Sequence, residues 1–249
     1  MSANPIRQQQ LVASTKAFLA RIAADFSPAV FASSLAAEDM VLTDMILRTG
    51  LPITIFTLDT GRLHAETLAM VERIHQTYGY AITLYRPQPQ AVDAWVAEHG
   101  RDAFYDSVEL RRQCCHIRKV EPLQRALANH TAWLTGQRRE QSVTRANLAL
   151  QEHDDAHQMI KFNPLADWLE DDVWHYLHSN QVPTNPLHER GYPSIGCEPC
   201  TRAIQPGEDL RAGRWWWEDP DSRECGLHLV DGKLTRISRN RQSTEGVKS

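Results

Sequence analysis

Cysteine is the residue type whose placement in this chain of 249 residues is most unusual. Cys114 and Cys115 are adjacent among basic side chains, and a C-x-x-C pair, Cys197 and Cys200, follows much later. Four thiolates are typical ligands of structural zinc and of iron–sulfur clusters. Two consecutive side chains diverge, which suits the separate iron corners of a cubane better than one zinc ion. The quartet therefore predicts a [4Fe-4S] cluster, with zinc or incidental buried thiols as the alternatives.

Basic residues surround the adjacent cysteines. Arg112, Arg118 and Lys119 would offset the negative charge of four thiolates. Lys119 stands four residues after Cys115, so the two side chains share one face if this segment is helical. We therefore expect Lys119 to connect the cysteine site electrostatically with a bound anion.

The fifth cysteine, Cys225, has no other cysteine near it in the sequence. The thiolate is the reactive form of cysteine, and an arginine-lined pocket would lower the pKa of the thiol. Cys225 is therefore a candidate nucleophile on a mobile segment, and an inert thiol in a tail is the alternative. His228, three residues later, is a candidate for binding the same anion.

Short polar side chains follow two of the predicted strands. Ser33 and Ser34 precede a helix with an acidic first turn, and the hydroxyl and N–H groups at such a start suit a phosphate or a sulfate. An ordinary helix cap is the alternative. Asp59 follows the next strand, where its carboxylate would accept hydrogen bonds from ribose hydroxyls or an adenine amine, unless it only forms the turn.

Arginines gather in two places. Arg138, Arg139 and Arg145 follow a predicted strand, where they would repel one another unless they are solvated or share an anion. Arg211 and Arg214 precede three consecutive tryptophans, which we expect to pack the tail against the body. Guanidinium groups match phosphate and sulfate oxygens, so both clusters are candidate anion sites, with a solvated face as the alternative for the first.

Hydrophobic periodicity predicts helices that alternate with strands. The predicted strands are 29–34, 53–58, 81–85, 131–136 and 159–162, and the predicted helices are 9–24, 38–47, 64–77, 89–99, a stretch through the cysteine pair to 120, 122–129 and 170–179. This alternation favours a Rossmann-like α/β fold in which helices cover both faces of a parallel sheet, with ligands beyond the carboxyl ends of the strands. We expect one adenine-nucleotide-binding domain over 1–217 and a flexible segment over 218–249, where the periodicity fades.

Composition narrows the class of protein. Hydrophobic residues make up 42% of the chain, as in ordinary globular enzymes, and a net charge of −4 argues against bulk nucleic-acid binding. No apolar run approaches the ~20 residues that cross a bilayer, and the polar start lacks a signal-peptide core, so we expect a cytoplasmic protein without a membrane partner. Nothing in the sequence argues against a homo-oligomer.

As an ordered set, these motifs resemble the assimilatory adenylyl-sulfate (APS) reductases, relatives of the 3′-phosphoadenylyl-sulfate (PAPS) reductases. The resemblance covers 28–228 and rests on 33–39, 58–62, the cysteine pair with Lys119, 136–145, 197–200, Arg211 with Arg214, and 224–228. Ala36 is a departure, because many relatives carry glycine there, and this change would restrict the backbone of the loop.

The resemblance implies reduction of APS to sulfite and AMP in sulfate assimilation and cysteine biosynthesis. Cys225 would attack the sulfur of APS to form an S-sulfocysteine, and thioredoxin or a glutaredoxin-type thiol donor would then release sulfite. Lys119, Arg211, Arg214 and His228 would neutralise the sulfo group, and AMP would be held by the strand-end loops. The cluster would position Lys119 rather than supply electrons.

Three other functions compete with this interpretation. A PAPS reductase would need extra positive charge for the 3′-phosphate. An RNA-thiolating enzyme of the PP-loop type would show a fuller Ser-Gly-Gly-x-Asp-Ser loop, which this chain lacks. A non-enzymatic metal-binding module would leave Cys225 and the arginine clusters unexplained.

Overall fold

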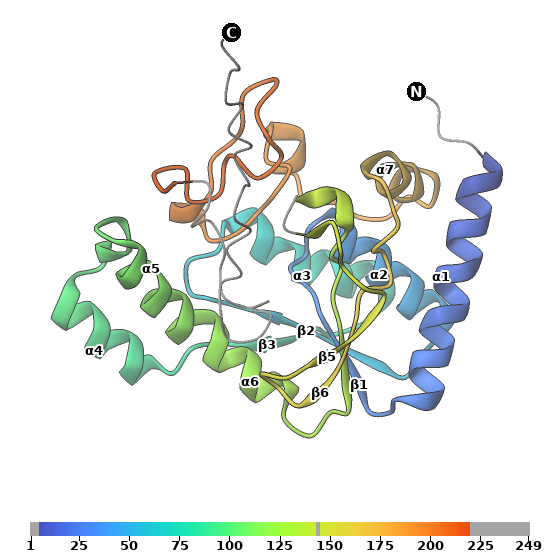
Figure 1. The fold of residues 1–249 in the computed structure, drawn as a ribbon, viewed down its shortest axis with the longest axis horizontal. Helices are drawn as coiled ribbons and strands as arrows, with labels where there is room; N and C mark the ends of the chain where they lie inside the picture. Colours follow the sequence, from blue (N-terminus) through green and yellow to red (C-terminus); the bar gives the residue numbers. More distant parts are fainter. Residues whose placement is uncertain (1–4, 143–144, 220–249) are drawn as a thin grey trace, which may run out of the picture.

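A six-stranded sheet forms the centre of the protein (Figure 1). The computed structural model describes residues 5–142 and 145–219. The strands lie in the order β3-β2-β1-β4-β6-β5, and all run parallel except β5, which pairs antiparallel with β6. Their bounds are β1 (Ala29–Ala32), β2 (Ile53–Leu58), β3 (Thr83–Tyr85), β4 (Ala132–Leu134), β5 (Gln151–Asp154) and β6 (Met159–Phe162).

Helices connect β1 to β2, β2 to β3 and β3 to β4, whereas the chain from β4 to β6 passes through η3 and β5. Their bounds are α1 (Pro5–Asp25), α2 (Ala37–Thr49), α3 (Ala65–Tyr78), α4 (Pro89–His99), α5 (Val108–Cys115), α6 (Glu121–Leu127) and α7 (Glu170–Ser179). Shorter turns are η1 (Ala103–Tyr105), η2 (His116–Val120), η3 (Arg139–Gln141), η5 (His188–Arg190) and η6 (Glu198–Cys200). Within the described ranges, no helix has the length and apolar character needed to cross a membrane.

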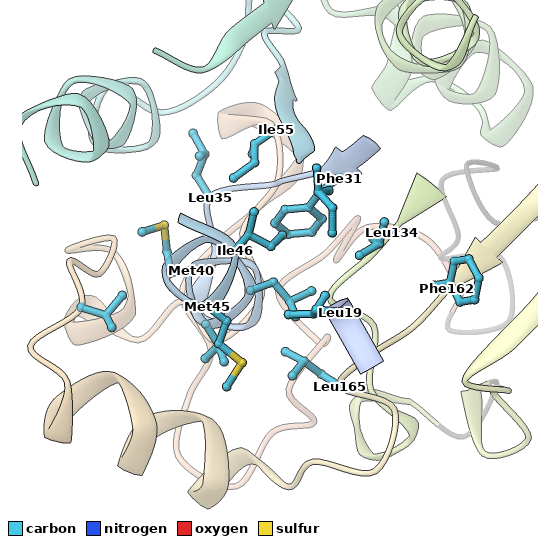
Figure 2. Close-up of a cluster of buried hydrophobic side chains, with 14 of the residues drawn as sticks. Leu19, Phe31, Leu35, Met40, Met45, Ile46, Ile55, Leu134, Phe162 and Leu165 are labelled. Carbon is cyan, nitrogen blue, oxygen red and sulfur yellow. The ribbon is translucent and has the colours of Figure 1, made fainter. Parts of the chain in front are cut away.

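The two faces of the sheet bury different side chains. Phe31 of β1 points into the larger core together with Leu19 of α1 and Ile46 of α2 (Figure 2). The same core contains buried residues of α3 and α7. Val30, its neighbour in sequence, points to the opposite face and packs with Leu123 and Leu127 of α6. Successive side chains of a strand alternate between faces, so a sheet covered on both faces needs apolar residues at nearly every position. This explains why β1 reads as a continuous apolar run.

The sheet has a topological switch point between β1 and β4. From β1 the chain builds outward through β2 and β3, and it then returns to add β4 and β6 on the other side. Ligands in open α/β folds bind at such a point, beyond the carboxyl ends of the neighbouring strands. Here these ends lead into Ser33 and into Thr135, and α2 begins directly after the β1 loop.

The predicted α/β fold with a mainly parallel, helix-flanked sheet is confirmed. The sequence did not predict β5, because its residues Gln-Glu-His-Asp are polar and none of them is buried, as suits an antiparallel edge strand.

The helix through the cysteines contains a π-helical turn, η2, before α6. Pro122 cannot donate a backbone hydrogen bond, which explains why the regular α-helical ladder is interrupted just before it. The predicted flexible segment falls outside the described residues from 220 onward.

Candidate active site

A cavity of about 260 Å³ lies at the carboxyl ends of the central strands. Loops after β1, β2 and β4 form one wall, and the stretch between α7 and Trp215 forms another. We call this cavity the nucleotide pocket. The lining residues that were predicted as site residues are Ser33, Ser34, Lys119, Arg138, Arg145, Cys197, Arg211 and Arg214.

The loop after β1 is folded back onto the start of α2. Ser34 donates to Asp39 Oδ2 from its backbone N–H at 2.6 Å and from its hydroxyl at 2.5 Å, and the N–H of Leu35 donates to Ser33 Oγ at 3.2 Å. Leu35 carries the positive φ of this loop, 64°, and its fully buried side chain holds it there. Ala36 has a φ of −86°, so the backbone at this position does not require glycine.

Asp39 and Gly136 bring the β1 and β4 loops together. A Cβ on Gly136 would overlap Asp39 Oδ1 and would lie 3.2 Å from the backbone nitrogen of Asp39. Only glycine lets the β4 loop approach this closely. Burial raises the pKa of Asp39 to about 6, against the hydrogen bonds from Ser34 that lower it. Neither residue was among the predicted binding residues, although both lie in stretches on which the resemblance rests, 33–39 and 136–145.

A histidine that was not predicted completes the start of α2. His188 Nε2 accepts a hydrogen bond from the N–H of Ala37 at 3.1 Å, while Nδ1 lies 2.9 Å from the carbonyl oxygen of Tyr192. This pattern requires a neutral ring with its proton on Nδ1. Burial lowers the pKa of His188, which keeps the ring neutral at pH 7. No local pattern links η5 to α2, so the sequence could not reveal this contact.

The structure separates the first group of predicted arginines. Arg138 is buried at the nucleotide pocket, and its guanidinium binds Glu38 at 2.9 Å and Glu140 at 2.7 Å. Arg145 also lines the pocket and donates to Gln141. Arg139 instead pairs with Asp167 and donates to the carbonyl oxygen of Leu148. The three side chains therefore do not converge on one anion.

Asp59 also lies apart from the pocket lining. Its carboxylate accepts a hydrogen bond from the N–H of Gly61 at 3.0 Å and pairs with Arg86 at 2.8 Å. The first contact is that of a turn-forming aspartate. Thr60, the next residue, lines the nucleotide pocket in its place.

The second group of arginines reaches the pocket from the segment after α7. Arg214 is 8% exposed, and its Nη1 donates to Ser194 Oγ at 3.2 Å. A Cβ on Gly196 would lie 2.6 Å from Arg214 Cζ, so this glycine leaves the space that the guanidinium fills. Arg211 lines the same wall. The structure therefore brings Arg211, Arg214 and Lys119 to one cavity.

The four cysteines line a second, smaller cavity of about 20 Å³, which we call the cysteine cavity. Arg111, Arg118 and Lys119 line it as well. Lys119 and Cys197 border both cavities, so the cysteine cavity adjoins the nucleotide pocket. The Thr60 hydroxyl lies 3.2 Å from Cys197 Sγ, which links the β2 loop to the C-x-x-C turn.

The four thiols are free, buried and close to positive charge. Burial raises the pKa of Cys114, and it raises the pKa of Cys200 to about 12, while Lys119 opposes both shifts. Such thiols become thiolates only with a strong positive partner. In the described part of the chain, no group of three or more His, Cys, Asp or Glu side chains is arranged around a single ion. Four cysteines around one cavity nevertheless fit the donor set of an iron–sulfur cluster.

Two predicted residues, the nucleophile Cys225 and the anion ligand His228, lie outside the described residues. Glu218, the first residue of the predicted flexible segment, is described and is buried. The described chain therefore continues in contact with the body at least as far as this residue.

Known proteins share both the sequence and the fold. Residues 28–203 match the model of the phosphoadenosine phosphosulfate reductase domain. The adenosine 5′-phosphosulfate reductase of Burkholderia cepacia is 63% identical over 227 residues, which cover 91% of this chain and 90% of that protein. The enzyme of the same name from Allochromatium vinosum is 57% identical over 84% of this chain and 82% of its own length.

A solved structure agrees with these relatives. The crystal structure of phosphoadenylyl-sulfate (PAPS) reductase from Candida auris, a phosphate complex, is 25% identical with a TM-score of 0.66, and the match covers 82% of this chain and 99% of that one. The domain match spans well over half of the chain, and the two bacterial enzymes are 63% and 57% identical to it. The chain therefore belongs to the family of the phosphoadenosine phosphosulfate reductase domain, which contains the APS and PAPS reductases.

Proposed function

We propose that this protein is an APS reductase, an oxidoreductase that converts adenylyl sulfate to sulfite and AMP in sulfate assimilation. The relatives named adenosine 5′-phosphosulfate reductase support this assignment. The observation that carries it is the junction of the two cavities. Lys119 and Cys197 belong to both linings, so an anion in the nucleotide pocket lies beside the cysteines.

The nucleotide and the sulfo group of APS would bind to different parts of the pocket. The crevice between β1 and β4 would take the adenosine and the phosphate, with the phosphate near the positive end of the α2 dipole. Lys119, Arg211 and Arg214 would surround the sulfo group, whose oxygens carry the negative charge. Their positive charges allow a second anion, a thiolate, to approach the sulfur.

The reaction then proceeds in two steps. In the first, the Cys225 thiolate attacks the sulfur of the sulfo group, an S–S bond forms, and the bond from this sulfur to the phosphate oxygen breaks. AMP leaves with the electron pair of that bond, and the enzyme holds an S-sulfocysteine. The positive charge around the pocket would lower the pKa of the Cys225 thiol and so favour the attacking form.

A dithiol donor of the thioredoxin or glutaredoxin type completes the turnover. Its thiolate attacks Cys225 Sγ, the S–S bond to the sulfo group breaks, and sulfite leaves with the electron pair. The second thiol of the donor then resolves the mixed disulfide, so the donor is oxidised by two electrons and Cys225 returns as a thiol. Such a cycle suits a reducing compartment such as the cytoplasm, and its sulfite would feed cysteine biosynthesis.

The four cysteines of the cysteine cavity would hold a [4Fe-4S] cluster. The cluster would supply a fixed charge beside the substrate, and both electrons come from the thiol donor. Lys119 borders both cavities, so its ammonium group would interact with the thiolates on one side and with the sulfo group on the other. This is the role that we assign to Lys119.

The charges of the pocket favour APS over PAPS. A 3′-phosphate needs additional positive charge, but the guanidinium of Arg138 is engaged by Glu38 and Glu140. Glu38 and Glu170 also line the pocket and would repel a further phosphate. The engagement of Arg138 is therefore the observation that argues for the substrate without the 3′-phosphate.

The test is to mix protein prepared without oxygen with APS alone and to determine the mass of the intact chain. We expect one added sulfo group, located on Cys225 by peptide mapping, with release of AMP. Cys225→Ser should show no adduct and should still bind AMP. An adduct with PAPS but not with APS would contradict the substrate assignment, and an adduct on another residue would contradict the role of Cys225.

A further inference from the structure

A buried arginine beside the cysteine cavity has no role in the reaction described above. Arg111, on α5, is 0% exposed. Its Nε and Nη2 donate to the two carboxylate oxygens of Glu218 at 2.7 and 2.8 Å, and the Glu218 side chain is 3% exposed. Removing both charges from water costs free energy that their attraction often does not recover. Apolar side chains of similar volume therefore often stabilise a fold as well or better. The pair therefore calls for an explanation other than stability.

The pair joins the cysteine helix to the wall of the nucleotide pocket. The guanidinium carbons of Arg111 and Arg214 each lie 4.7 Å from the ring centroid of Trp215. Arg111 lines the cysteine cavity and also interacts with the Cys115 thiol, whereas Arg214 lines the nucleotide pocket. One buried indole ring is thus in contact with a cation from each cavity.

The backbone around Trp215 is held in an unusual conformation. Its φ is +43°, in the left-handed region that residues other than glycine rarely adopt. The N–H of Trp215 donates to the carbonyl oxygen of Cys200 at 3.1 Å, and the N–H of Glu218 donates to the carbonyl oxygen of Trp215 at 2.9 Å. The stretch from Arg214 to Glu218 is therefore fixed to the C-x-x-C turn by its backbone and to α5 by Arg111.

The end of this fixed stretch lies close in sequence to the proposed nucleophile. Cys225 follows Glu218 by seven residues (218 to 225). Seven residues span at most about 25 Å when fully extended, so the place where Glu218 is held limits where Cys225 can reach. A change of position at Glu218 would change the fraction of time that the thiolate spends near the sulfo group.

We propose that Arg111 and Glu218 form a positioning pair, which fixes the point from which the segment carrying Cys225 continues and holds Trp215 and Arg214 at the nucleotide pocket. This inference rests on the proposed function. It assigns neither residue to contact with the substrate. The pair acts through Cys225 and Arg214, and its effect is on the rate of sulfur transfer rather than on the binding of AMP.

The test is Glu218→Gln, which keeps the shape of the side chain and removes its charge. We expect S-sulfocysteine formation from APS to slow by about tenfold or more in a single turnover, because misplacing a reacting group by about 1 Å has effects of this size. The Kd for AMP should stay within about threefold of that of the unchanged protein, a difference of less than about 1 kcal/mol. Alkylation of Cys225 by iodoacetamide, measured at a pH that ionises the thiol in both proteins, should continue at an unchanged rate, which shows that the thiol is still available.

A matched control lies in the same part of the chain. Arg202 and Glu208 also form a two-point ion pair, at 2.8 Å, but their side chains are about one third exposed. Glu208→Gln should leave adduct formation unchanged. Arg111→Lys keeps the charge of the arginine but cannot donate in parallel to both carboxylate oxygens, so it should reproduce the defect of Glu218→Gln. Glu218→Asp, which keeps the carboxylate, should recover part of the rate.

Two results would overturn the inference. The first is an unchanged rate of adduct formation in both Glu218→Gln and Arg111→Lys. The second is a parallel loss of AMP binding in these variants, which would make the pair a general support of the fold. Absence of the adduct in the unchanged protein would reject the proposed function itself. Failure of the inference would be seen only in the variants, so the two outcomes can be distinguished.

Discussion

The two cavities of this protein are built in different ways. The nucleotide pocket lies where the strand order of the sheet reverses, and its β1 side is formed by short side chains, the start of α2 and a close glycine. The cysteine cavity lies beside the sheet, between the α5–η2 region and the C-x-x-C turn, and it depends on buried ionic side chains. The first site follows from topology, whereas the second is assembled from segments far apart in sequence. Variants at the two sites should therefore fail differently.

The largest effect is expected at Lys119, where the two sites meet. Lys119→Ala should lower turnover by about 100-fold or more, as loss of a charge-stabilising group commonly does. Visible absorption of the proposed cluster should persist, and the Kd for AMP should change little. Lys119→Arg should retain part of the activity because it keeps the charge. Loss of the absorption in Lys119→Ala would instead make this residue a structural support of the cysteine site.

Gly136→Ala should damage the nucleotide pocket alone. The added Cβ overlaps the Asp39 carboxylate and approaches the backbone of α2, so the β1 and β4 loops must move apart. Overpacking of this kind costs about 1–3 kcal/mol, and we expect the affinity for AMP to fall by about 30-fold. Calorimetric titration with AMP checks this, and the absorption of the proposed cluster should be unaffected. Unchanged AMP affinity would show that the nucleotide binds elsewhere.

Gly196→Ala should affect the sulfo half of the site. Its Cβ would displace the guanidinium of Arg214, which is the flexible end of a side chain, so the fold should tolerate the change. We expect the KM for APS to rise by about tenfold, in the range for loss of one charge-assisted hydrogen bond. Because AMP lacks the sulfo group, its Kd should stay constant. A matching rise in the Kd for AMP would place Arg214 at the nucleotide instead.

The smallest effect on turnover is expected from Asp39→Asn, which changes how stability depends on pH. The folded pKa of Asp39 is raised from 3.8 to about 6, so between these values the folded state binds more protons than the unfolded state. This group therefore makes the protein less stable as pH rises from about 4 to about 6, by about 2–3 kcal/mol in total, and has no further effect above that range.

Urea unfolding at several pH values measures this contribution. The free energy of unfolding of Asp39→Asn relative to the unchanged protein should increase from pH 4 to pH 6 and then level off. Comparison of the two proteins removes the titration of all other groups. A constant difference across this range would mean that the Asp39 carboxylate titrates at its ordinary pKa.

The part of the structure that follows from local sequence patterns could be predicted, and the part that depends on contacts between distant segments could not. Apolar runs and the spacing of turns predicted the strands of the central sheet, and a parallel sheet places its ligands at one edge, so Ser33 and Ser34 were found without coordinates. Cysteine is rare and chemically specific, which is why the quartet was found as well. The pattern of a strand is local in the sequence, and the cysteine quartet is recognised by residue type alone.

What the sequence could not reveal depends on pairing over long distances. Arg138 was expected at an anion and is instead engaged by Glu38, and the Arg111 to Glu218 and His188 to Ala37 contacts join segments that no periodicity connects. The polar strand β5 carries no apolar alternation to mark it. Tertiary packing decides which partner a charged side chain takes, and the sequence around it gives little indication of that choice.

The central claim is that the two cavities work as one active site, with the nucleotide released before any reductant is needed. The most direct measurement is the amount of AMP formed from APS in the absence of a thiol donor. We predict one AMP per protein chain and no sulfite, followed by stoichiometric sulfite once a dithiol donor is added. Continuous AMP release without a donor, or no AMP until a donor is present, would contradict the account.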